Sequence, residues 1–326
     1  MAKALFIEEA GQDPEVTIRD LDASILPEGD VDVDVLWSSL NYKDALAVTG
    51  RSPIVRAPFP FVPGIDLVGQ VTGSRSDEFR AGDLVVQTGW GLGENRFGGF
   101  SEKARVKAAH LVPLPSGLQP REAMIIGTAG FTAMLACLSL EDHGTAEGPI
   151  VVTGASGGVG SFSVMLLKAL GYKVVASTGS GNVEYLKSLG ADEIIPRGDL
   201  AAGAARPMDS ARWGGAIDSV GGATLEALIS QTGTRGAVAA CGLAGGAGLR
   251  TTVFPFILRG VGLLGIDSNT CPRPLRRKAW DRLSELCQST LLDRMATEIR
   301  LPEVPDHARA LLDNRKHGRT VVRCFG

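Results

Sequence analysis

The chain has 326 residues, enough for one large or two medium-sized domains with a well-buried core. Hydrophobic residues make up 44% of it and charged residues 21%, and the net charge is −3, so the composition gives no reason to expect a nucleic-acid or membrane partner. The five cysteines are scattered, odd in number and without CxxC spacing, which argues against a disulfide framework and against a structural zinc site.

The first residues do not have the pattern of a targeting segment. Residues 1–6 lack the long apolar stretch of a signal peptide, and no apolar run reaches membrane-spanning length. We therefore expect a cytoplasmic protein without a membrane partner.

Residues 1–125 have the pattern of an all-β region. Aspartate and valine alternate over residues 30–35, which places the valines on one face of a strand and the aspartates on the other. Further strands are expected over residues 65–71, 83–87 and 101–106. Dense short strands separated by glycine and proline turns indicate a barrel-like domain.

From Arg121 onward the spacing of apolar residues becomes helical, and strands then alternate with helices. Six strands alternating with helices imply a doubly wound parallel sheet. The expected strands lie at residues 150–152, 173–177, 193–195, 216–219, 237–240 and 262–266.

A glycine turn after the first of these strands indicates a dinucleotide site. The strand runs into Ala155-Ser156-Gly157-Gly158-Val159-Gly160, and a dense apolar helical segment follows and ends at Gly171. Such a turn brings backbone N–H groups and the positive end of a helix to a pyrophosphate. Alanine replaces the first glycine of the commoner fingerprint. The expected cofactor contacts here are Ser156, Gly157, Gly158 and Val159.

The end of the second strand indicates which dinucleotide binds. An NAD site usually has an acidic side chain there, but residues 177–182 read Ser-Thr-Gly-Ser-Gly-Asn, with no carboxylate before Glu184. Hydroxyl and N–H groups can bind a 2′-phosphate that an acid would repel, so we expect NADPH. The contacts would be Ser177, Thr178 and Ser180. The alternative is a solvated loop in which Asn182 caps the next helix, and the two can coexist.

Two glycine-containing pairs follow later strands. Gly221-Gly222 and Gly242-Leu243 would lie at the carboxyl edge of the sheet, where ligands bind in such folds. We expect Gly242 and Leu243 to contact the cofactor, although simple connecting turns would also explain both pairs.

The last part of the chain contains a basic helix over residues 273–283 and a strand over residues 320–323, which we expect to return to the first domain. The predicted division is a β domain formed by residues 1–126 and 266–326, and a nucleotide-binding domain formed by residues 127–265.

Five segments together resemble one superfamily over essentially the whole chain. The segments are Leu40-Asn41-Tyr42-Lys43-Asp44, Pro63-Gly64-Ile65-Asp66, Thr88-Gly89-Trp90-Gly91, residues 127–134 and residues 264–268. They resemble the medium-chain dehydrogenase/reductase superfamily, specifically the acryloyl-CoA reductase group of its zinc-independent quinone oxidoreductase branch. The resemblance implies a GroES-like β-barrel catalytic domain, a Rossmann domain with a six-stranded parallel sheet, and further cofactor contacts from Thr128, Ile266 and Arg319. We also expect a homodimer.

Two positions depart from patterns found within that superfamily. Its zinc alcohol dehydrogenases have a cysteine near the position of Tyr42 and a histidine at that of Ile65, and neither tyrosine nor isoleucine can replace them as zinc ligands. We therefore expect no metal. The reductase group often has an arginine facing the 2′-phosphate where this chain has Ser180. Either the preference for NADPH is weaker, or a cation from elsewhere binds the phosphate.

The resemblance implies NADPH-dependent reduction of a short 2-enoyl-CoA, acryloyl-CoA to propionyl-CoA. Hydride would add at Cβ, charge would develop on the thioester oxygen, and Cα would take a proton. The resemblance places Asn41 beside the nicotinamide, to position the cofactor or bind the oxyanion, with Tyr42 as a candidate proton donor. An Asx turn and a packed aromatic are the alternatives. Asp44, the third catalytic candidate, is expected to hold the loop, and Trp90 to line the substrate pocket or belong to the core.

The phosphates of a coenzyme A ester would need cations. We expect Arg276 and Arg277 of the basic helix to supply them, although a charged helix face is commonly only solvated. A broad-specificity NADPH:quinone or enone oxidoreductase would need no such surface and is the alternative function. A third possible function is that of a nucleotide-binding protein with a sensing role. The presence of Asn41, Tyr42 and the glycine turn together counts against this function.

Overall fold

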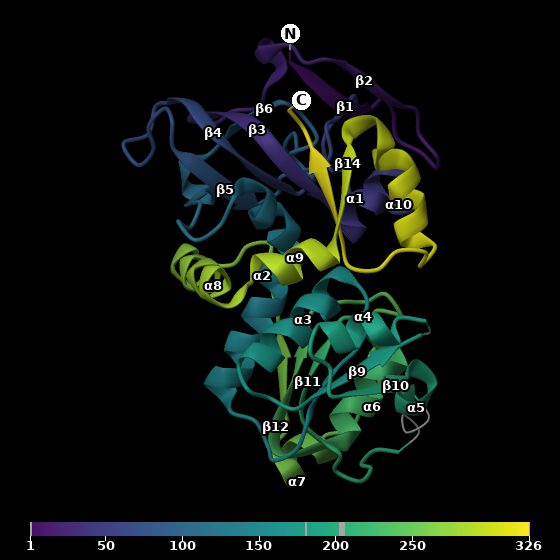
Figure 1. Cartoon of the computed structure of the whole chain (residues 1–326). Coiled ribbons are helices and arrows are strands. Elements are labelled where there is room, and N and C mark those ends of the chain that lie inside the picture. The colour runs from purple at the N-terminus through teal and green to yellow at the C-terminus, as the bar shows by residue number, and fades with distance from the viewer. Residues whose placement is uncertain (1, 180, 202–205, 326) are drawn as a thin grey trace. The chain divides into compact units, whose positions relative to one another are not determined.

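The computed structural model describes residues 2–179, 181–201 and 206–325. The chain forms two compact units, which we call unit 1 (Met1–Thr128 with Ser268–Gly326) and unit 2 (Ala129–Asp267). The unit boundaries follow residues 128 and 267, whereas the sequence indicated residues 126 and 265. In Figure 1 the purple and blue beginning of the chain and its yellow end belong to unit 1, and most of the teal and green middle belongs to unit 2.

Unit 1 is built on a seven-stranded sheet. Its strands run in the order β14 (Ala296–Arg300), β15 (Arg319–Arg323), β3 (Val31–Leu40), β4 (Asp66–Ser74), β5 (Leu84–Thr88) and β7 (Val112–Pro113), with β6 (Lys103–Val106) also paired to β3. A separate antiparallel pair consists of β1 (Lys3–Ile7) and β2 (Val16–Asp20). The helices are α1 (Tyr42–Val48), α8 (Arg273–Leu286), α9 (Ser289–Met295) and α10 (Val304–Leu312).

The alternating segment predicted over residues 30–35 begins β3. Its valines have no more than 1% of their surface exposed, because they face the core on one side of the sheet. On the other side Asp32 and Asp34 pair across the strands with Arg105 and Lys103 of β6, at 2.6 and 3.0 Å. The same period-two pattern thus explains both the buried face and the charged face of this strand.

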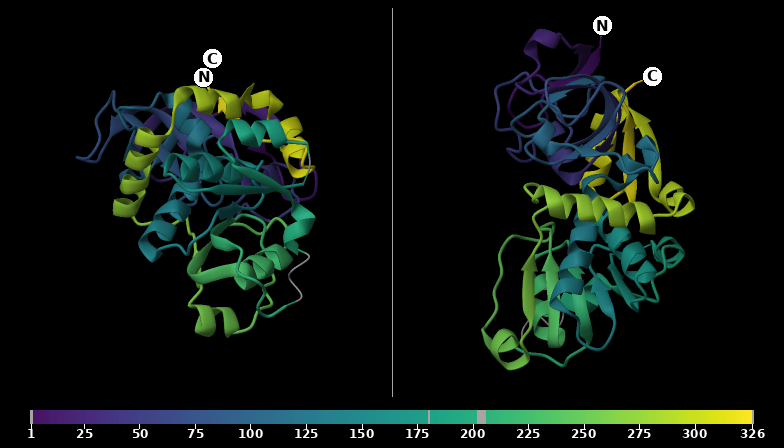
Figure 2. Two further views of the ribbon diagram at one scale, coloured as in Figure 1. Left: turned by 60° about the horizontal axis from the view of Figure 1, so that its bottom comes forward. Right: turned by 90° about the vertical axis from the view of Figure 1, so that its left-hand side faces the viewer.

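The end of the chain completes this sheet. Strand β15 inserts between β14 and β3, and Thr320 lies opposite Leu40 in the antiparallel register. Figure 2 shows these yellow strands beside the blue strands of unit 1. The predicted return of the last strand to the first domain is therefore confirmed, and it brings Arg319 close to the end of β3.

Unit 2 contains a six-stranded sheet in which every pairing is parallel. The strand order is β10 (Glu193–Pro196), β9 (Val174–Thr178), β8 (Ile150–Val152), β11 (Trp213–Asp218), β12 (Thr232–Ala240) and β13 (Gly262–Gly265). The helices are α3 (Gly158–Ala169), α4 (Val183–Ser188), α5 (Arg197–Ala201), α6 (Gly222–Gln231) and α7 (Phe254–Arg259). The doubly wound fold predicted from the alternation of strands and helices is confirmed.

Helices cover the parallel sheet on both faces. Val151 and Val175 pack in one core cluster with Leu228 of α6. Ile150 and Val152 point to the opposite face, since side chains alternate along a strand, and both are at most 1% exposed. Burial on both faces explains why these strands are continuous apolar runs rather than alternating ones.

Helix α2 (Pro120–His143) is long and apolar enough to cross a membrane, whereas no apolar run of that length is expected from the sequence. However, 89% of its most apolar window is buried inside the protein. It is also kinked, because Gly127 has φ 47° and ψ −156°. These are features of a core helix.

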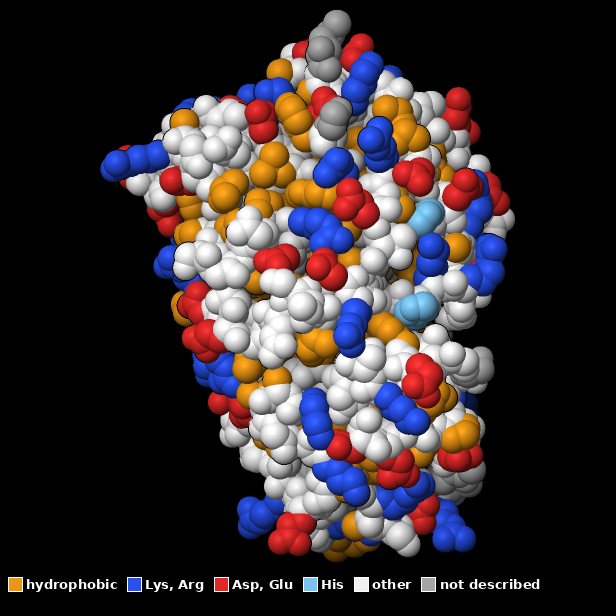
Figure 3. All heavy atoms as spheres, in the orientation of Figure 1, with side chains coloured by type: hydrophobic (Ala, Val, Ile, Leu, Met, Phe, Trp, Pro, Cys, Tyr) orange, Lys and Arg blue, Asp and Glu red, His pale blue; other side chains and the backbone are white. Residues whose placement is uncertain are grey.

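On the face shown in Figure 3, acidic and basic side chains are interspersed, in keeping with the small net charge.

Candidate active site

Asn41 stands at the junction between β3 and α1 in unit 1. Its backbone N–H donates to Asp44 Oδ2 at 2.8 Å, as in a capping box, and this turns the chain from the strand into the helix. Only 7% of Asn41 is exposed, so its side-chain amide needs partners within the protein.

The Asn41 side chain connects two carboxylates and a guanidinium. Its Nδ2 donates to Asp44 Oδ2 at 3.1 Å and to Asp66 Oδ2 at 2.8 Å, while its Oδ1 accepts from Arg319 Nη1 at 3.1 Å. Both amide hydrogens are therefore directed at carboxylates. In this geometry Asn41 links the residues around it, and its role in positioning the cofactor or binding the substrate oxyanion stays a prediction.

Asp66, at the start of β4, is the centre of this network and is fully buried. Besides Asn41, its carboxylate accepts from Ser39 Oγ at 2.5 Å, Thr128 N at 2.9 Å and Thr128 Oγ1 at 2.5 Å. Thr128, expected at the cofactor, is thus anchored to Asp66 within unit 1. Sequence reasoning did not assign Asp66 a role. The available signal was a carboxylate inside an apolar strand, which must be paired when buried.

Gly127 allows the backbone to approach this network. Its φ of 47° is unfavourable for residues with a side chain. A Cβ there would lie 2.6 Å from Asp66 Oδ2, 2.7 Å from Ser39 Oγ and 2.8 Å from Arg319 Nη2. Glycine is therefore required both for the backbone conformation and for the space.

Asp44 holds the loop before β4, as expected. Its Oδ1 accepts from Ile65 N at 2.8 Å. Burial, together with the nearby charge of Asp66, raises the pKa of Asp44 from 3.8 to about 7, against the opposing effect of the hydrogen bonds from Asn41 and Ile65. Between about pH 4 and pH 7 the folded chain therefore keeps a proton on Asp44 that the unfolded chain releases.

This pKa predicts a specific dependence of stability on pH. Between about pH 4 and pH 7 the unfolded chain releases the Asp44 proton while the folded chain retains it, so wild-type stability falls as pH rises and levels off above pH 7. Relative to Asp44→Asn, the wild type should lose up to about 4 kcal/mol over this range. Urea unfolding of both proteins from pH 4 to 8 measures the difference, and a pH-independent difference would contradict the assigned pKa.

Tyr42 is the first residue of α1 and differs from the buried residues around it. Its side chain is 49% exposed. No hydrogen bond of its phenol is found within the described part of the chain. The packed-aromatic alternative is therefore wrong, and the role of proton donor stays a prediction.

Trp90 belongs to a tight loop with left-handed backbone. Its own φ is 57°, and those of Gly89 and Gly91 are 72° and 78°. The indole stacks on His110, with ring centroids 5.0 Å apart and planes 6° from parallel. Burial, and then the positive charge of neighbouring Arg96, Lys107 and Arg276, lowers the pKa of His110 to about 4, so the imidazole is neutral at physiological pH. Trp90 is thus stacked on a neutral ring, and its contact with substrate stays a prediction.

Arg276 does not have the expected role. It is 2% exposed, and Nη1 donates to Thr88 O at 2.7 Å and to Thr88 Oγ1 at 2.6 Å. Its Nη2 donates to the carbonyls of Ser268 and Asn269 at 3.0 and 3.3 Å. These bonds join α8 to the end of β5 and to the segment before α8, and they leave the guanidinium unsuited to bind a coenzyme A phosphate. Arg277 is exposed and remains a candidate.

The glycine turn in unit 2 has the geometry that a dinucleotide needs. Gly154 has φ 57°, and a Cβ at Gly160 would lie 2.2 Å from Gly154 O, so only glycine permits this approach of helix to turn. Helix α3 begins at Gly158, after the exposed Gly157, and Gly158 and Val159 are half-buried. The first N–H groups of the helix are thus available to an anion. The residues present fit a dinucleotide.

The remaining predicted cofactor residues lie near strand ends of unit 2. Ser156 Oγ and Thr178 Oγ1 are 3.3 Å apart, whereas Ser177 is only 2% exposed. Gly242 packs on the carbonyl of Ser219, and Leu243 is 66% exposed. Ile266 N donates to Ala240 O, which extends β13. Ser180 lies outside the described residues, and Arg319, described above, lies in unit 1.

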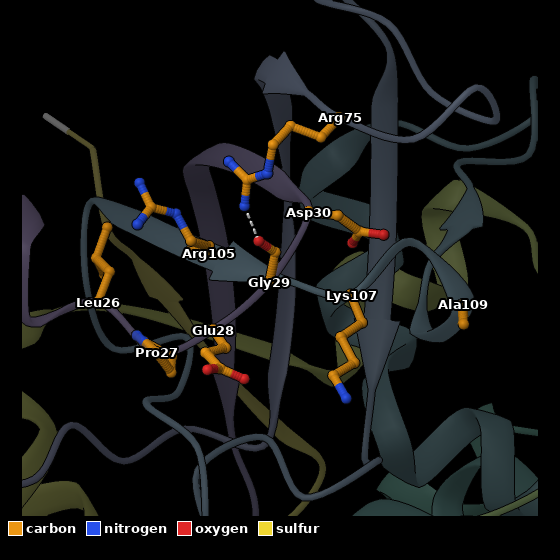
Figure 4. A pocket seen from close by; sticks show the side chains of 9 residues that line it. All are labelled: Leu26, Pro27, Glu28, Gly29, Asp30, Arg75, Arg105, Lys107 and Ala109. Carbon is orange, nitrogen blue, oxygen red and sulfur yellow. Dashed lines mark hydrogen bonds between the residues drawn. The ribbon is translucent and has the colours of Figure 1, made fainter.

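A pocket of about 600 Å³ opens elsewhere in unit 1 (Figure 4). It is lined by Leu26, Pro27, Glu28, Gly29, Asp30, Arg75, Arg105, Lys107 and Ala109, which include none of the predicted site residues. Arg105 of this pocket pairs with Asp32 near the beginning of β3, and Asn41 follows the end of that ten-residue strand. At about 3.3 Å per residue the two ends are roughly 30 Å apart. Two of the basic side chains that line the pocket already have partners within the protein: Arg75 donates to Gly29 O, and Arg105 pairs with Asp32.

The metal-free expectation stays a prediction. In the part of the chain that the structure describes, no three His, Cys, Asp or Glu side chains are grouped so that they could hold a metal ion. Dialysis against a strong chelator should leave activity unchanged within about twofold, since Tyr42 and Ile65 stand where ligands would be needed. Activity that is lost on dialysis and restored by zinc alone would overturn it.

The two units define the class of protein: a pyridine-nucleotide oxidoreductase with a catalytic unit formed by both ends of the chain. Residues 27–116 match the family model described as alcohol dehydrogenase GroES-like domain. Residues 158–288 match the one described as zinc-binding dehydrogenase, a stretch that excludes Tyr42 and Ile65. The chain belongs to the medium-chain dehydrogenase/reductase superfamily, as the resemblance implied.

Several relatives match over nearly their full length. The Escherichia coli K12 protein named probable acrylyl-CoA reductase AcuI is 52% identical, covering 98% of this chain and 99% of its own. Acrylyl-CoA reductase AcuI of Ruegeria pomeroyi is 46% identical, covering 97% and 96%. A Bacillus subtilis protein with the provisional name quinone oxidoreductase YhfP is 43% identical, covering 98% of both chains.

Two solved structures have the same fold. E. coli K-12 YHDH with bound NADPH superposes with a TM-score of 0.95 at 52% identity, covering 99% of this chain and 100% of its own. Bacillus subtilis yhfP with NAD bound has a TM-score of 0.95 at 43% identity, covering 99% of both chains. The GroES-like and Rossmann assignments are confirmed.

Proposed function

We propose that the chain reduces the C=C bond of a short 2-enoyl-CoA, acryloyl-CoA to propionyl-CoA, by hydride transfer without a metal. The observation that supports this proposal most strongly is the similarity, over nearly the full length, to two proteins named acrylyl-CoA reductase, at 52% and 46% identity. The chain is an NADPH-dependent oxidoreductase, in agreement with the NADPH-bound structure at 52% identity. The acyl substrate is the part that the proposal adds.

The residues of the chain have separate tasks in this reaction. When bound, NADPH supplies the hydride that adds to Cβ of the enoyl group. The glycine turn and the first N–H groups of α3 bind the pyrophosphate. The exposed phenol of Tyr42 holds the proton that Cα receives. Asn41, fixed between Asp44, Asp66 and Arg319, sets the position of the residue that follows it.

A broad-specificity quinone or enone reductase is the second candidate. One observation favours it: Arg276, expected to bind coenzyme A phosphates, is occupied by Thr88 and by backbone carbonyls. The relative at 43% identity with a provisional quinone oxidoreductase name is in line with this candidate.

Consumption of NADPH with four substrates side by side distinguishes the candidates. Acryloyl-CoA should react fastest and crotonyl-CoA more slowly, because activity should fall as the acyl chain lengthens. Free acrylate should be a very poor substrate, because it lacks the coenzyme A moiety whose binding energy orients the acyl group and it carries its own charge. Benzoquinone turning over faster than acryloyl-CoA at equal concentration would favour the second candidate.

The homodimer and the cytoplasmic location stay predictions. Strand β13 lies at one edge of the parallel sheet, and Ile257 and Leu258 of the preceding helix α7 are 69% and 64% exposed. An edge strand beside exposed apolar side chains is suited to a second copy of the chain.

A further inference from the structure

An ion pair joins the first turn of α1 to the loop that carries Trp90. Lys43, the second residue of α1, places its Nζ 2.8 Å from Oε1 of Glu94. The Glu94 side chain is only 7% exposed, so its carboxylate needs a partner within the protein. In the described part of the chain, Lys43 is the only cation within 4.0 Å of that carboxylate. The pair therefore connects two segments that lie 51 residues apart in the sequence.

The backbone of the loop of residues 89–96 holds Glu94 in place. The N–H of Glu94 donates to Gly91 O at 3.1 Å, which closes a tight turn. A Cβ at Gly93 would lie 2.7 Å from the carbonyl carbon of Gly64, so the loop packs directly on another backbone segment of unit 1. The carboxylate thus stands on a hydrogen-bonded and closely packed turn.

Tyr42 depends on its neighbours in the chain for its position. Its side chain is 49% exposed, and its phenol has no hydrogen bond within the described residues. On one side of it, Asn41 is bonded to Asp66 at 2.8 Å. On the other side, Lys43 is bonded to Glu94 at 2.8 Å. A residue between two anchored side chains is placed by the backbone that they hold.

We propose that Glu94, acting through Lys43, is a positioning residue for proton transfer from Tyr42 to Cα of the substrate. The Lys43 ammonium is 37% exposed, so water screens the ion pair and the pair contributes little to stability. Its effect is on geometry, because it holds the helical turn that bears the phenol. A misplacement of about 1 Å at a reacting group can lower a rate by about 10²-fold.

The inference rests on the proposed function, and specifically on Tyr42 as the proton donor. In that step the phenolic O–H bond breaks as a C–H bond forms at Cα of the enolate, and the phenolate then takes a proton from water. Glu94 and Lys43 do not exchange a proton with the substrate in this scheme. They set the distance and direction over which the phenolic proton moves.

Glu94→Gln, compared with Asp34→Asn, tests the proposal in the full-length protein. Each substitution removes one negative charge from an ion pair of unit 1 and nearly preserves the shape of the side chain. Asp34 pairs with Lys103 at 3.0 Å, and at about 3.3 Å per residue along β3 it lies roughly 23 Å from Asn41. Four quantities are measured: kcat and KM for acryloyl-CoA, the solvent deuterium isotope effect on kcat, and the isotope effect of NADPH deuterated at the transferred hydrogen. Urea unfolding verifies that each variant is folded under the assay conditions.

Glu94→Gln should lower kcat by about tenfold to hundredfold, with KM within about threefold of the wild type. Its solvent isotope effect should rise and that of deuterated NADPH should fall, because proton transfer becomes slower than hydride transfer. Asp34→Asn should match the wild type in all four quantities. The double variant Lys43→Glu with Glu94→Lys restores an ion pair, and it should recover at least about half of the loss in the logarithm of kcat.

Two results would overturn the role of Glu94 alone, in wild-type protein that reduces acryloyl-CoA. One is a wild-type kcat in Glu94→Gln. The other is a lower kcat with both isotope effects unchanged, which would report a smaller fraction of active enzyme and not a misplaced proton donor.

Two further results would remove the basis of the inference. Wild-type protein that does not reduce acryloyl-CoA would overturn the proposed function, and this inference with it. A wild-type kcat in Tyr42→Phe would overturn the proton donor and therefore the role of Glu94, while the proposed substrate would stand.

Discussion

Replacing Tyr42 with phenylalanine is expected to lower kcat for acryloyl-CoA by about 10²–10⁴-fold, the contribution typical of a positioned proton donor. The substitution removes only the phenolic hydroxyl. Because the side chain is 49% exposed and its hydroxyl has no hydrogen bond within the described residues, its loss should change the free energy of unfolding by less than about 0.5 kcal/mol. A large kinetic effect would therefore report on the reaction and not on the fold.

Steady-state kinetics and urea unfolding on the same preparations separate the two effects. Tyr172→Phe is a suitable control, since Tyr172 lies in unit 2, and burial, with the nearby charge of Glu141, raises the pKa of its phenol without linking it to the Asn41 network. Its kcat should match the wild type within about twofold. If Tyr42→Phe retains wild-type kcat, the proton comes from another group or from water, and Tyr42 only occupies the loop.

Gly127→Ala is expected to destabilise unit 1 by about 3 kcal/mol or more. The φ of 47° and ψ of −156° cost a residue with a Cβ about 1–3 kcal/mol. The added methyl group would also lie 2.6 to 2.8 Å from three atoms of the buried network. Moving those atoms breaks hydrogen bonds to a buried carboxylate, and each bond lost in this way costs about 1–3 kcal/mol.

Gly82→Ala is the matched control for the backbone effect alone. Gly82 has φ 98°, and a Cβ there would meet no atom within 4 Å. Its substitution should cost only the conformational strain, about 1 kcal/mol. Urea unfolding monitored by tryptophan fluorescence compares the free energies of unfolding of the two variants. Equal destabilisation would mean that the network around Gly127 accommodates the methyl group without losing stability.

The parallel sheet could be predicted from sequence because its signals are local. The buried strand Ile150–Val152, the glycine turn after it and Gly171 beyond α3 lie within one short stretch. Each element there has its own chemical reason, namely β-branched side chains, close backbone approach, and a positive φ of 87° at Gly171.

The polar network could not be predicted because it joins distant parts of the chain. Asn41 and Arg319 are 278 residues apart, and no period or spacing links them. The role of Arg276 depends likewise on what it meets in space, the carbonyl and hydroxyl of Thr88. Residue type indicated a cation for a phosphate, and only the fold showed that this guanidinium is bound within unit 1.

The insertion of β15 between β14 and β3 has a consequence for synthesis on the ribosome. At about 5–20 residues per second, the 278 residues from Asn41 to Arg319 take roughly 15–55 s to be made. During that interval β3 has an unpaired edge, and Asn41 and Asp66 lack the Arg319 guanidinium that lies beside them in the folded chain. Unit 2, formed by the continuous stretch Ala129–Asp267, can fold in the meantime. The nascent chain thus acquires its cofactor-binding half first, and its catalytic half depends on protection of that open edge until the last strand emerges.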